Sequence, residues 1–295
     1  MAAQTRTIRR RIKSVTNTRK ITKAMELVAA SKMRKAMQSV LGTRPYAQLA
    51  WNAILSIAAK IDTNLHPLLR ERKEIKKVLL ILITSDRGLA GGFNTNIIRK
   101  TMEQIRTIGS SVEIQTICIG KRGADAMKRA NQSILASFTE ITNNTKFEEV
   151  LPIGRMVIHE FTNGDFDRVL IAYTDFISAI TQKPIILELL PLGLDSQSIQ
   201  ENESSIASVS EYTFEPSPRA VLDRILPRLV ETMLYQAVLE SAASEHSSRM
   251  MAMRSASDAA GDMIGNLTFA YNQARQAGIT QEIAEISSGK AALET

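Results

Sequence analysis

The most extended pattern in the chain lies at its C-terminal end. Residues that favour helix run from Ala220 to Leu293, and no proline follows Pro227. As a single helix, this stretch would be about 100 Å long, whereas helices of globular domains usually have about 8–20 residues. The pattern therefore predicts a rod that packs along another long element or reaches into another protein.

Within this predicted rod, apolar and small residues recur at alternating spacings of three and four. The positions are Met250, Met253, Ser257, Ala260, Ile264, Leu267, Tyr271 and Ala274. This spacing is the a/d pattern of a coiled-coil seam. The small residues in it let a partner helix approach closely, so we expect a second helix on this face.

A second long helix is predicted over residues 3–60. Its apolar residues form three short stripes, namely Ile8, Ile12 and Val15, then Ile21, Met25 and Val28, then Met33, Met37 and Val40. Because the stripes shift in phase, the predicted buried face turns around the helix as it does in a wound pair. Gly42 and Pro45 predict a weak point, since proline interrupts helical hydrogen bonding.

Residues 76–192 follow a different pattern, in which apolar β-branched runs alternate with segments of helical spacing. The predicted strands are Val78–Thr84, Val112–Ile119, Ile134–Ile141, Arg168–Tyr173 and Lys183–Leu190. The predicted helices are Asn94–Thr107, Ala124–Ala130 and Glu148–Phe161. Such alternation predicts a parallel or mixed sheet with helices packed on it.

The order of the elements predicts an α/β protein with long helices. We expect an antiparallel coiled coil, formed by the N- and C-terminal helices, and a central Rossmann-like α/β domain. Each end helix has an apolar stripe too long for the sheet domain to cover, and pairing the two helices covers both stripes. The predicted segments are 1–62 for the N-terminal helix, 63–75 for a connection, 76–193 for the α/β domain, 194–217 for a polar linker and 218–295 for the C-terminal helix.

Composition excludes several classes of protein. The hydrophobic content of 44% is ordinary for a soluble protein, and the low aromatic content of 5% is more typical of long helical assemblies than of sandwich or barrel cores. The longest purely apolar run, Val78–Ile83, is far too short to cross a bilayer. Basic residues interrupt the first apolar stretch, so the sequence predicts no signal peptide.

The formal net charge of +7 is unevenly placed. Residues 1–36 carry many Lys and Arg side chains against a single acid, Glu26. This basic arm predicts an acidic partner, which could be nucleic acid, lipid head groups or acidic protein loops. A solvated helix face is the alternative interpretation of the same charges.

A glycine cluster at Gly88–Gly92 follows a predicted strand and precedes a predicted helix, as phosphate-binding loops do. Its spacing matches neither the dinucleotide fingerprint nor the Walker loop, and no acid follows the second strand to hold a ribose. A tight turn between strand and helix is the favoured interpretation.

The remaining candidate groups do not form a recognisable chemical site. The histidines at positions 66, 159 and 246 are scattered and lack metal-ligand spacing. Ser244, Glu245 and His246 are neighbours on a predicted helix and therefore point in different directions, unlike a catalytic triad. The single Cys118 lies in an apolar run and is expected to be buried. We expect no cofactor and no metal.

Four segments together identify a family. The run Ile12–Lys35 closely resembles the N-terminal helix of the gamma subunit of F-type ATP synthase, and Thr84–Asn94 is similar to that family's central loop. Ser244–Met253 and Tyr271–Ile286 resemble its C-terminal signature. The similarity covers nearly the whole chain in order, and each motif is long.

The resemblance implies a role as well as a fold. In the family, the coiled coil is the central rotor stalk inside a hexamer of alternating alpha and beta subunits, and the α/β foot rests with the epsilon subunit on the membrane-embedded c-ring. It implies one copy in each complex, coupling of proton-driven rotation to ATP synthesis and hydrolysis, and no catalytic residue in this chain. The basic arm would then face acidic beta-subunit loops, and the chain would not insert into the membrane.

The resemblance also implies contact residues for the beta subunits. By motif match, these are Lys23, Met25, Arg275, Gln276, Thr280 and Glu282. Met25 is expected beside a mobile beta loop, and Arg275 with Gln276 is expected to bond to a second loop. The sequence departs from the family near the tip of the rod, where Lys290 stands in a tract that is often apolar or small.

Two alternatives come from other classes of function. The first is a basic coiled-coil protein that binds nucleic acid, although residues 6–35 lack the interleaved aromatic side chains of single-strand binders. The second is a dinucleotide-dependent enzyme built on residues 76–192, which depends on the glycine cluster alone. Absence of bound nucleotide in the purified chain would count against the second.

The expected location follows from the resemblance and the position of its first motif. The motif starts by Ile12, which leaves too little chain before it for a transit peptide. We therefore expect a peripheral membrane protein on the cytoplasmic face of a bacterial inner membrane. The matrix side of the mitochondrial inner membrane is the alternative.

Overall fold

The computed structural model describes residues 2–58, 66–72, 74–109, 111–143, 145–192 and 217–293. Two compact units are present, which we call the sheet unit (Ser31–Ser248) and the two-helix unit (Met1–Ala30 with Arg249–Thr295). The helices α1 (Ala2–Ala58) and α6 (Pro218–Leu293) contribute to both units. The predicted linker 194–217 lies outside the described residues except for its last residue, and the predicted connection 63–75 is described only in part.

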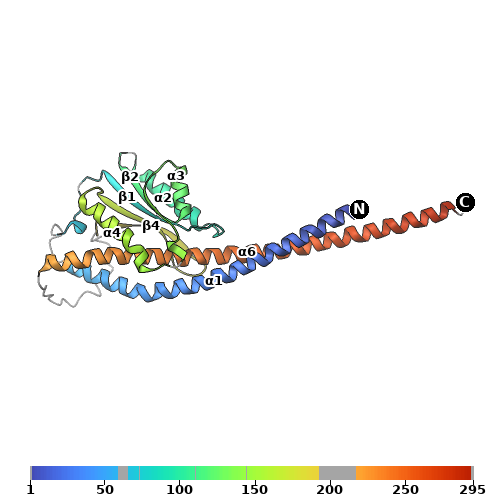
Figure 1. Ribbon diagram of the computed structural model, residues 1–295, viewed down its shortest axis with the longest axis horizontal. Helices are drawn as coiled ribbons and strands as arrows, with labels where there is room; N and C mark the ends of the chain where they lie inside the picture. Colours follow the sequence, from blue (N-terminus) through green and yellow to red (C-terminus); the bar gives the residue numbers. More distant parts are fainter. Residues whose placement is uncertain are drawn as a thin grey trace. The chain divides into compact units, whose positions relative to one another are not determined.

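The sheet unit contains a five-stranded mixed sheet with strand order β3-β2-β1-β4-β5 (Figure 1). Its strands are β1 (Lys77–Ile83), β2 (Glu113–Ile119), β3 (Ser133–Phe138), β4 (Arg168–Phe176) and β5 (Gln182–Leu190). The first four are parallel, and β5 runs antiparallel to β4. The predicted mixed sheet is confirmed, and each predicted strand overlaps an observed one.

The two faces of the sheet carry separate cores because successive side chains of a strand point to opposite sides. In β1, Leu80 and Leu82 belong to the core beneath α2 (Phe93–Ile108) and α3 (Lys121–Arg129). The intervening side chains of β1 belong to the larger core beneath α4 (Phe147–Asn163) and α6. The short 3-10 helices η2 (Pro67–Leu69) and η3 (Ile141–Asn143) complete the described elements of this unit.

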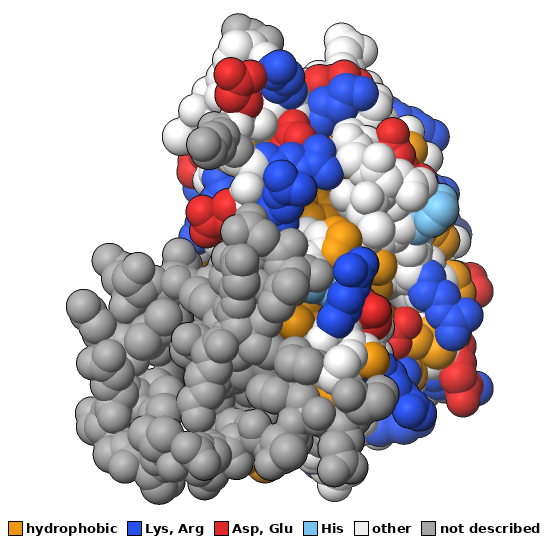
Figure 2. Space-filling view, turned by 90° about the vertical axis from the view of Figure 1, so that its left-hand side faces the viewer, with side chains coloured by type: hydrophobic (Ala, Val, Ile, Leu, Met, Phe, Trp, Pro, Cys, Tyr) orange, Lys and Arg blue, Asp and Glu red, His pale blue; other side chains and the backbone are white. Residues whose placement is uncertain are grey.

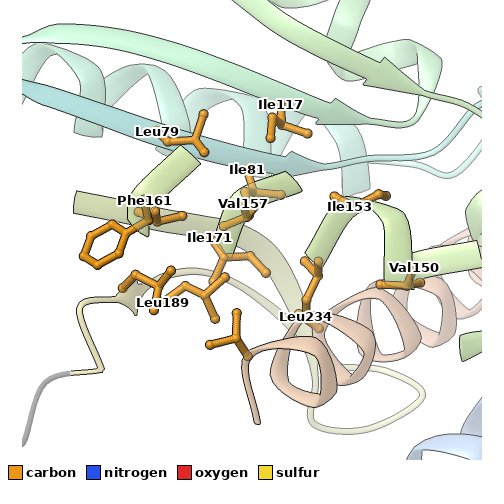
Figure 3. Close-up of a cluster of buried hydrophobic side chains, with 14 of the residues drawn as sticks. Leu79, Ile81, Ile117, Val150, Ile153, Val157, Phe161, Ile171, Leu189 and Leu234 are labelled. Atoms are coloured by element: carbon orange, nitrogen blue, oxygen red, sulfur yellow. The ribbon is translucent and has the colours of Figure 1, made fainter. Parts of the chain in front are cut away.

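The larger core joins three layers, as Figure 3 shows. Leu79 and Ile81 point from β1 toward Val157 and Phe161 of α4, and Leu234 enters the same cluster from α6. All five of these side chains have relative exposures of 2% or less. The sheet, α4 and α6 therefore share one hydrophobic core.

Within the sheet unit, α6 is covered on almost every side. No residue from Leu229 to Ser247 is exposed, as is typical of a helix surrounded by other elements. On another side of α6, Val40 of α1 packs with Leu239 and Ala243. Further along α1, the Thr43 hydroxyl donates a hydrogen bond to Gln236, which comes before Leu239 in α6. Later residues of α1 thus meet earlier residues of α6, so the two helices are antiparallel, as predicted.

In the two-helix unit, only a narrow seam of α6 is covered. Met253, Ser257 and Ala260 are buried, and further partly covered positions recur every three or four residues as far as Gly278. The Ser257 hydroxyl donates to the backbone carbonyl oxygen of Arg19 at 3.4 Å, which places α1 directly against this seam. The predicted a/d seam is confirmed.

One predicted stripe of α1 is wrong. Ile21 and Val28 are 61% and 58% exposed, whereas Ala29 is buried. The covered side of α1 in this stretch therefore includes Ala29 and excludes Ile21 and Val28. The buried face of α1 keeps its phase, and the helix continues through Gly42 and Pro45 without a break.

Asp167, next to the start of β4, holds the start of β1 in place. Its carboxylate accepts hydrogen bonds from the backbone N–H groups of Lys76 and Lys77 and from Arg72 Nη1, each at 2.8 Å. Desolvation acts to raise the pKa of Asp167, but the donated hydrogen bonds outweigh it and the pKa lies below its ordinary value. The ionised carboxylate therefore stabilises this corner of the sheet unit.

Replacing this carboxylate tests how much it contributes to the stability of the sheet unit. We expect Asp167→Asn to lower the free energy of unfolding by about 1–3 kcal/mol, because it replaces charge-assisted hydrogen bonds with weaker neutral ones. The pKa is lower in the folded chain, so the stabilisation is present above about pH 4 and is lost as pH falls through the folded pKa. Denaturant unfolding across acidic pH should show a steeper loss in the parent than in the variant.

The exposed neighbour Asp165 supplies the control for this measurement. Asp165→Asn should keep both the stability and the acid slope of the parent. Identical acid slopes for the parent and Asp167→Asn would show that the carboxylate of Asp167 contributes nothing specific.

Cys118, in β2, is fully buried in the core beneath α2 and α3. Burial raises the pKa of its thiol to about 12. The reactive thiolate is therefore scarce at neutral pH. This agrees with the expectation that Cys118 is a packed hydrophobic residue.

The burial of Cys118 predicts chemical inertness in the folded chain. An alkylating reagent should modify the thiol at neutral pH only after denaturant is added, as measured by intact-mass spectrometry. Cys118→Ala should remove the modification altogether. Rapid alkylation of the native chain would show that the thiol is accessible and that its assigned place in the core is wrong.

Candidate functional site

The six residues predicted to contact a partner all lie in the two-helix unit. Lys23 and Met25 are on α1, and Arg275, Gln276, Thr280 and Glu282 are on α6. Met25 is half-buried and the other five are exposed. Exposure on two long helices suits contact with another protein rather than catalysis in a pocket.

The structure arranges these residues in two separate groups. Ser257 of α6 contacts Arg19, which is one helical turn from Lys23. Because the helices are antiparallel, α6 residues beyond Ser257 run toward the start of α1, away from Lys23 and Met25. At the α-helical rise, Arg275 is about 27 Å beyond Ser257 along α6. The two groups can therefore meet different parts of a partner.

Lys23 in the first group has a local ion-pair partner. Its Nζ atom lies 2.9 and 3.1 Å from the two carboxylate oxygens of Glu26, one turn further along α1. The Lys23 side chain is 57% exposed and that of Glu26 is 13% exposed. The Lys23 ammonium is thus on the solvent side of this pair and is accessible to a carboxylate on another protein.

The second group spans the point at which the covered seam of α6 ends, with Arg275 and Gln276 before it and Thr280 and Glu282 beyond it. The seam ends at Gly278, and residues 279–288 are all exposed. Arg275, Ile279, Glu282 and Ile286 share one face by their spacing. Ile279 and Ile286 are 48% and 74% exposed. An isolated helix is marginally stable in water, so this segment is suited to being enclosed by a partner.

Several further surface residues were missed by the sequence interpretation because they were expected to be buried or were not considered. They are the exposed apolar side chains Ile21, Leu27 and Val28 on α1 and Met263, Phe269 and Ile283 on α6. The sequence did contain a signal for this surface, because these apolar residues lie outside the three-four spacing of the seam. Large exposed apolar areas are typical of interaction surfaces.

Basic side chains extend this surface along α1. The exposed ones in the two-helix unit are Arg6, Arg9, Arg10, Arg11, Lys13, Arg19, Lys20 and Lys23. This concentration contrasts with the face of the sheet unit in Figure 2, where Lys and Arg side chains lie beside Asp and Glu side chains. The charge of α1 favours an acidic partner surface.

The glycine-rich loop serves the fold of the sheet unit. Just before it, one oxygen of the Asp86 carboxylate accepts from the Lys121 N–H at 3.0 Å and the other accepts from the Glu140 N–H at 2.8 Å. These bonds tie together the chain segments that follow β1, β2 and β3. At Gly120, which has a φ of +98°, a Cβ atom would lie 2.1 Å from the carbonyl oxygen of Thr84. The strand ends thus approach closely.

The serines around His246 also have structural roles. The Ser244 hydroxyl donates to the carbonyl oxygen of Thr174 at 3.1 Å, and the Ser248 hydroxyl donates to Gln182 Oε1 at 3.1 Å. Ser247 donates in the same way to the carbonyl oxygen of Ala179. These hydroxyls fasten α6 to the end of β4 and the turn into β5. The Ser244–His246 run is consistent with packing rather than a triad.

Among the described residues, no group of three or more His, Cys, Asp or Glu side chains is placed to hold a metal ion. Within the same residues, no helix combines the length and apolar character that crossing a membrane requires.

The family model and the relatives that match this chain all name ATP synthase. A family model described as ATP synthase matches residues 4–293. The ATP synthase gamma chain of Cupriavidus necator is 42% identical over 99% of this chain and 100% of its own length. That of Heliobacterium modesticaldum is 44% identical, with 98% of each chain covered.

Solved structures give the same result for the fold. A chain of the central stalk and c-ring of Tetrahymena thermophila mitochondrial ATP synthase is 27% identical, with a TM-score of 0.61 over 80% of this chain and 99% of that one. A chain of the Euglena gracilis mitochondrial ATP synthase rotor has a TM-score of 0.65 over 95% of this chain and 100% of that one. At 20% identity, the second match bears on the fold alone.

These matches cover the two long helices and the sheet domain together, and they give no support to the nucleic-acid alternative. The similarity in sequence extends over almost the whole of both chains. The chain therefore belongs to the ATP synthase gamma chain family.

Proposed function

We propose that this chain is the central rotor stalk of an F-type ATP synthase. In this role it couples proton-driven rotation of a c-ring to conformational changes at catalytic sites on beta subunits, for ATP synthesis and hydrolysis. The observation that carries the proposal is the uncovered end of α6, where residues 279–288 are exposed and include three isoleucines. A single exposed helix of this composition is suited to a surrounding protein ring.

The mechanism follows from asymmetry. A pair of helices inside a ring of three equivalent beta subunits presents a different surface to each of them. A partner shifts a conformational equilibrium only by its differential affinity for the states. Rotation of the helices moves that difference from one beta subunit to the next, so the affinities for ADP, phosphate and ATP change in turn. The catalytic groups belong to the beta subunits.

The two groups of contact residues have distinct tasks in this proposal. Lys23, beside the basic surface of α1, attracts acidic loops of the beta subunits, while Met25 provides an uncharged surface over which such a loop can slide. Arg275 and Gln276 bond to a second loop nearer the end of α6. A planar guanidinium can meet a carboxylate with two hydrogen bonds. Thr280 and Glu282 extend the second group along α6.

The partners are those of a rotor. The proposed set is a hexamer of alpha and beta subunits around the helices, an epsilon subunit and a c-ring against the sheet unit, with one copy of this chain in each complex. The match to a chain of the central stalk and c-ring of Tetrahymena thermophila mitochondrial ATP synthase supports this assignment. We place the chain in a membrane-bound complex, peripherally, on the cytoplasmic face of a bacterial inner membrane.

Reconstitution tests the proposal directly. Mixing the full-length chain with alpha and beta subunits should give a complex with one copy of this chain, measured by native mass spectrometry. The complex should hydrolyse ATP, and the chain by itself should not. A stable homodimer that ignores alpha and beta subunits would contradict the stalk role.

The Arg275 and Gln276 pair should matter more for energy transfer than for assembly. Both side chains are exposed, so replacing them should leave the fold intact. Losing a charge-assisted hydrogen bond at an interface costs about 2–5 kcal/mol, and this contact forms at only some rotor angles. We expect Arg275→Ala with Gln276→Ala to leave the complex assembled and to lower ATP synthesis and hydrolysis about tenfold or more.

A matched control replaces residues of the same types in the sheet unit, the exposed Arg129 and the half-buried Gln132. Arg129→Ala with Gln132→Ala should keep both rates near those of the parent complex. If the variant at 275 and 276 also works at parental rates, the proposed loop contact is absent.

Met25 provides a separate test of coupling. We expect Met25→Lys to create a new attraction to acidic beta loops that resists rotation. Proton pumping should fall more than ATP hydrolysis, measured together in membrane vesicles. Met25→Leu keeps an apolar side chain and should preserve the ratio of the two rates. Equal proportional losses of pumping and hydrolysis in Met25→Lys would rule out a specific coupling defect.

A further inference from the structure

His66 precedes the short helix η2 and caps it. Its backbone is extended, with φ −136° and ψ 135°, and Pro67 follows at the start of the helix. The Nδ1 atom of the ring accepts a hydrogen bond from the backbone N–H of Leu68 at 3.1 Å. The side-chain cap of η2 is thus an imidazole nitrogen, whereas helices more often use the oxygen of Ser, Thr, Asp or Asn.

The second nitrogen of the ring faces α6. Nε2 lies 3.3 Å from Asp223 Oδ1. The His66 side chain is 9% exposed, whereas that of Asp223 is 56% exposed. The ring therefore bridges η2 and α6, with one nitrogen in the buried cap and the other beside a carboxylate at the surface.

The bond from Leu68 determines the protonation state of the ring. A ring nitrogen accepts an N–H only when it carries no hydrogen itself, so Nδ1 is unprotonated in this arrangement. The neutral ring then has its hydrogen on Nε2, where it can be donated to Asp223. A doubly protonated ring would place an N–H of His66 against the N–H of Leu68 and could not make this bond. The contact fits only the neutral ring with its hydrogen on Nε2.

The segment that this cap fixes belongs to the larger core of the sheet unit. Leu68 and Leu69 are 1% and 3% exposed and share that core with Leu222 of α6. The carbonyl oxygen of Leu68 accepts a hydrogen bond from the N–H of Leu192, which follows β5, at 2.8 Å. Both backbone polar groups of Leu68 therefore have partners, and loss of the His66 bond would leave a buried N–H unsatisfied.

The surroundings of the ring also favour its neutral form. Burial has the largest effect and lowers the pKa of His66, while the carboxylate of Asp223 raises it and the guanidinium of Arg219 lowers it. Both charged groups lie near the start of α6. The other elements beside η2, α4 and the chain after β5, contribute apolar core side chains such as Phe161 and Leu192. The net direction for the pKa of His66 is downward, in agreement with the hydrogen bond to Nδ1.

We propose that His66 is an acid-sensitive cap, in which the neutral ring fastens η2 to α6 and protonation at Nδ1 releases η2. When Nδ1 takes up a proton, it becomes a donor and no longer accepts from Leu68. Two N–H groups then face each other at a buried position, so the ring must turn away or η2 must move. The contact with Asp223 can persist as an ion pair, and the contact that breaks is the one to η2. The cap is a property of the sheet unit and does not depend on the rotor role.

Two substitutions separate the roles of the two ring nitrogens. The side-chain oxygen of asparagine is as many bonds from the backbone as Nδ1, so His66→Asn keeps an acceptor for Leu68 and removes the titrating group. The amide nitrogen of glutamine reaches about as far as Nε2, so His66→Gln keeps a donor toward Asp223 and lacks the cap. The matched control is His159→Asn, which replaces an exposed histidine of α4.

The sign of the pH dependence follows from linkage. Because the pKa of His66 is lower in the folded than in the unfolded chain, its stabilisation is fully present above about pH 6.5, the unfolded value, and is lost as pH falls from there through the folded pKa. Between these values, the unfolding equilibrium constant of the parent, relative to His66→Asn, should rise by up to about tenfold for each pH unit. Denaturant unfolding of the full-length chains between about pH 5 and 8 measures this. His159→Asn should keep the parental pH dependence, and parallel curves for the parent and His66→Asn would overturn the proposal.

The cap itself is tested at alkaline pH, where the ring is neutral. His66→Gln should have an unfolding equilibrium constant about tenfold larger than that of His66→Asn, because only His66→Gln leaves the Leu68 N–H unsatisfied. The contact with the exposed Asp223 contributes little by comparison. Equal constants for the two variants would show that Nδ1 does not act as a cap and would overturn the proposal.

Nitrogen NMR of the imidazole rings gives a measurement that does not depend on stability. In the full-length parent at neutral pH, the ring of His66 should carry its hydrogen on Nε2 and have an unprotonated Nδ1. Its signals are those that disappear in His66→Asn and persist in His159→Asn. A ring with hydrogen on Nδ1, whether neutral or charged, would contradict the assigned state and overturn the cap.

Hydrogen–deuterium exchange tests the release of η2. The parent and His66→Asn are compared at the same pH, so that the intrinsic exchange rates cancel. The peptide that contains Leu68 and Leu69 should lose protection in the parent as the pH falls below about 6.5 and should keep it in His66→Asn. Equal protection of this peptide in both chains at every pH would show that protonation does not release η2 and would overturn the proposal.

Discussion

The first half of α6 is packed among the sheet, α4 and α1, and its residues from Leu229 to Ser247 have no exposed side. The same helix is therefore part of a domain core and the start of a long extension. The packing between α4 and α6 is close, since a Cβ atom on Gly154 of α4 would lie 3.2 Å from Glu231 Cγ of α6. Serine hydroxyls add fixed points, since Ser244 and Ser248 bond to β4 and β5. A helix held in this way resists slipping or turning within the sheet unit.

The second half of α6 has the opposite character. Only a narrow seam is covered, and over residues 279–288 nothing in the described chain covers the helix. The outer surface combines exposed apolar residues on both helices with a concentration of basic residues on α1. Such a surface costs free energy in water unless another protein covers it. The first half of α6 is firmly packed, and its second half exposes a surface for other proteins. This combination suits a subunit that transmits movement to other subunits.

Much of this organisation could be predicted from the sequence because it depends on local periodicity. The three-four spacing from Met250 to Ala274 gave the seam of α6, and β-branched runs gave all five strands. The long motifs identified the family. The stripe through Ile21 and Val28 was misjudged, because apolar residues on a shaft can serve an outer contact as well as an inner one.

Other features could not be read from the sequence because they depend on tertiary contacts. His66 and Asp223 are far apart in the chain, and nothing in their local patterns indicates that they meet. The two groups of contact residues could be named by resemblance. Their separation along the helix pair depends on the register of α1 against α6, which the contact between Ser257 and Arg19 sets. Their roles toward the beta subunits remain predictions.

Rotation of the sheet unit can be observed directly in single complexes. Because Cys118 is buried, a cysteine introduced at the exposed Ile180 can carry a light-scattering particle on the sheet unit. With the complex fixed to a surface through its beta subunits, we expect the particle to turn in one direction while ATP is hydrolysed and to stop when ATP is removed. A particle that stays still while the same complexes hydrolyse ATP at the normal rate would contradict the rotor role.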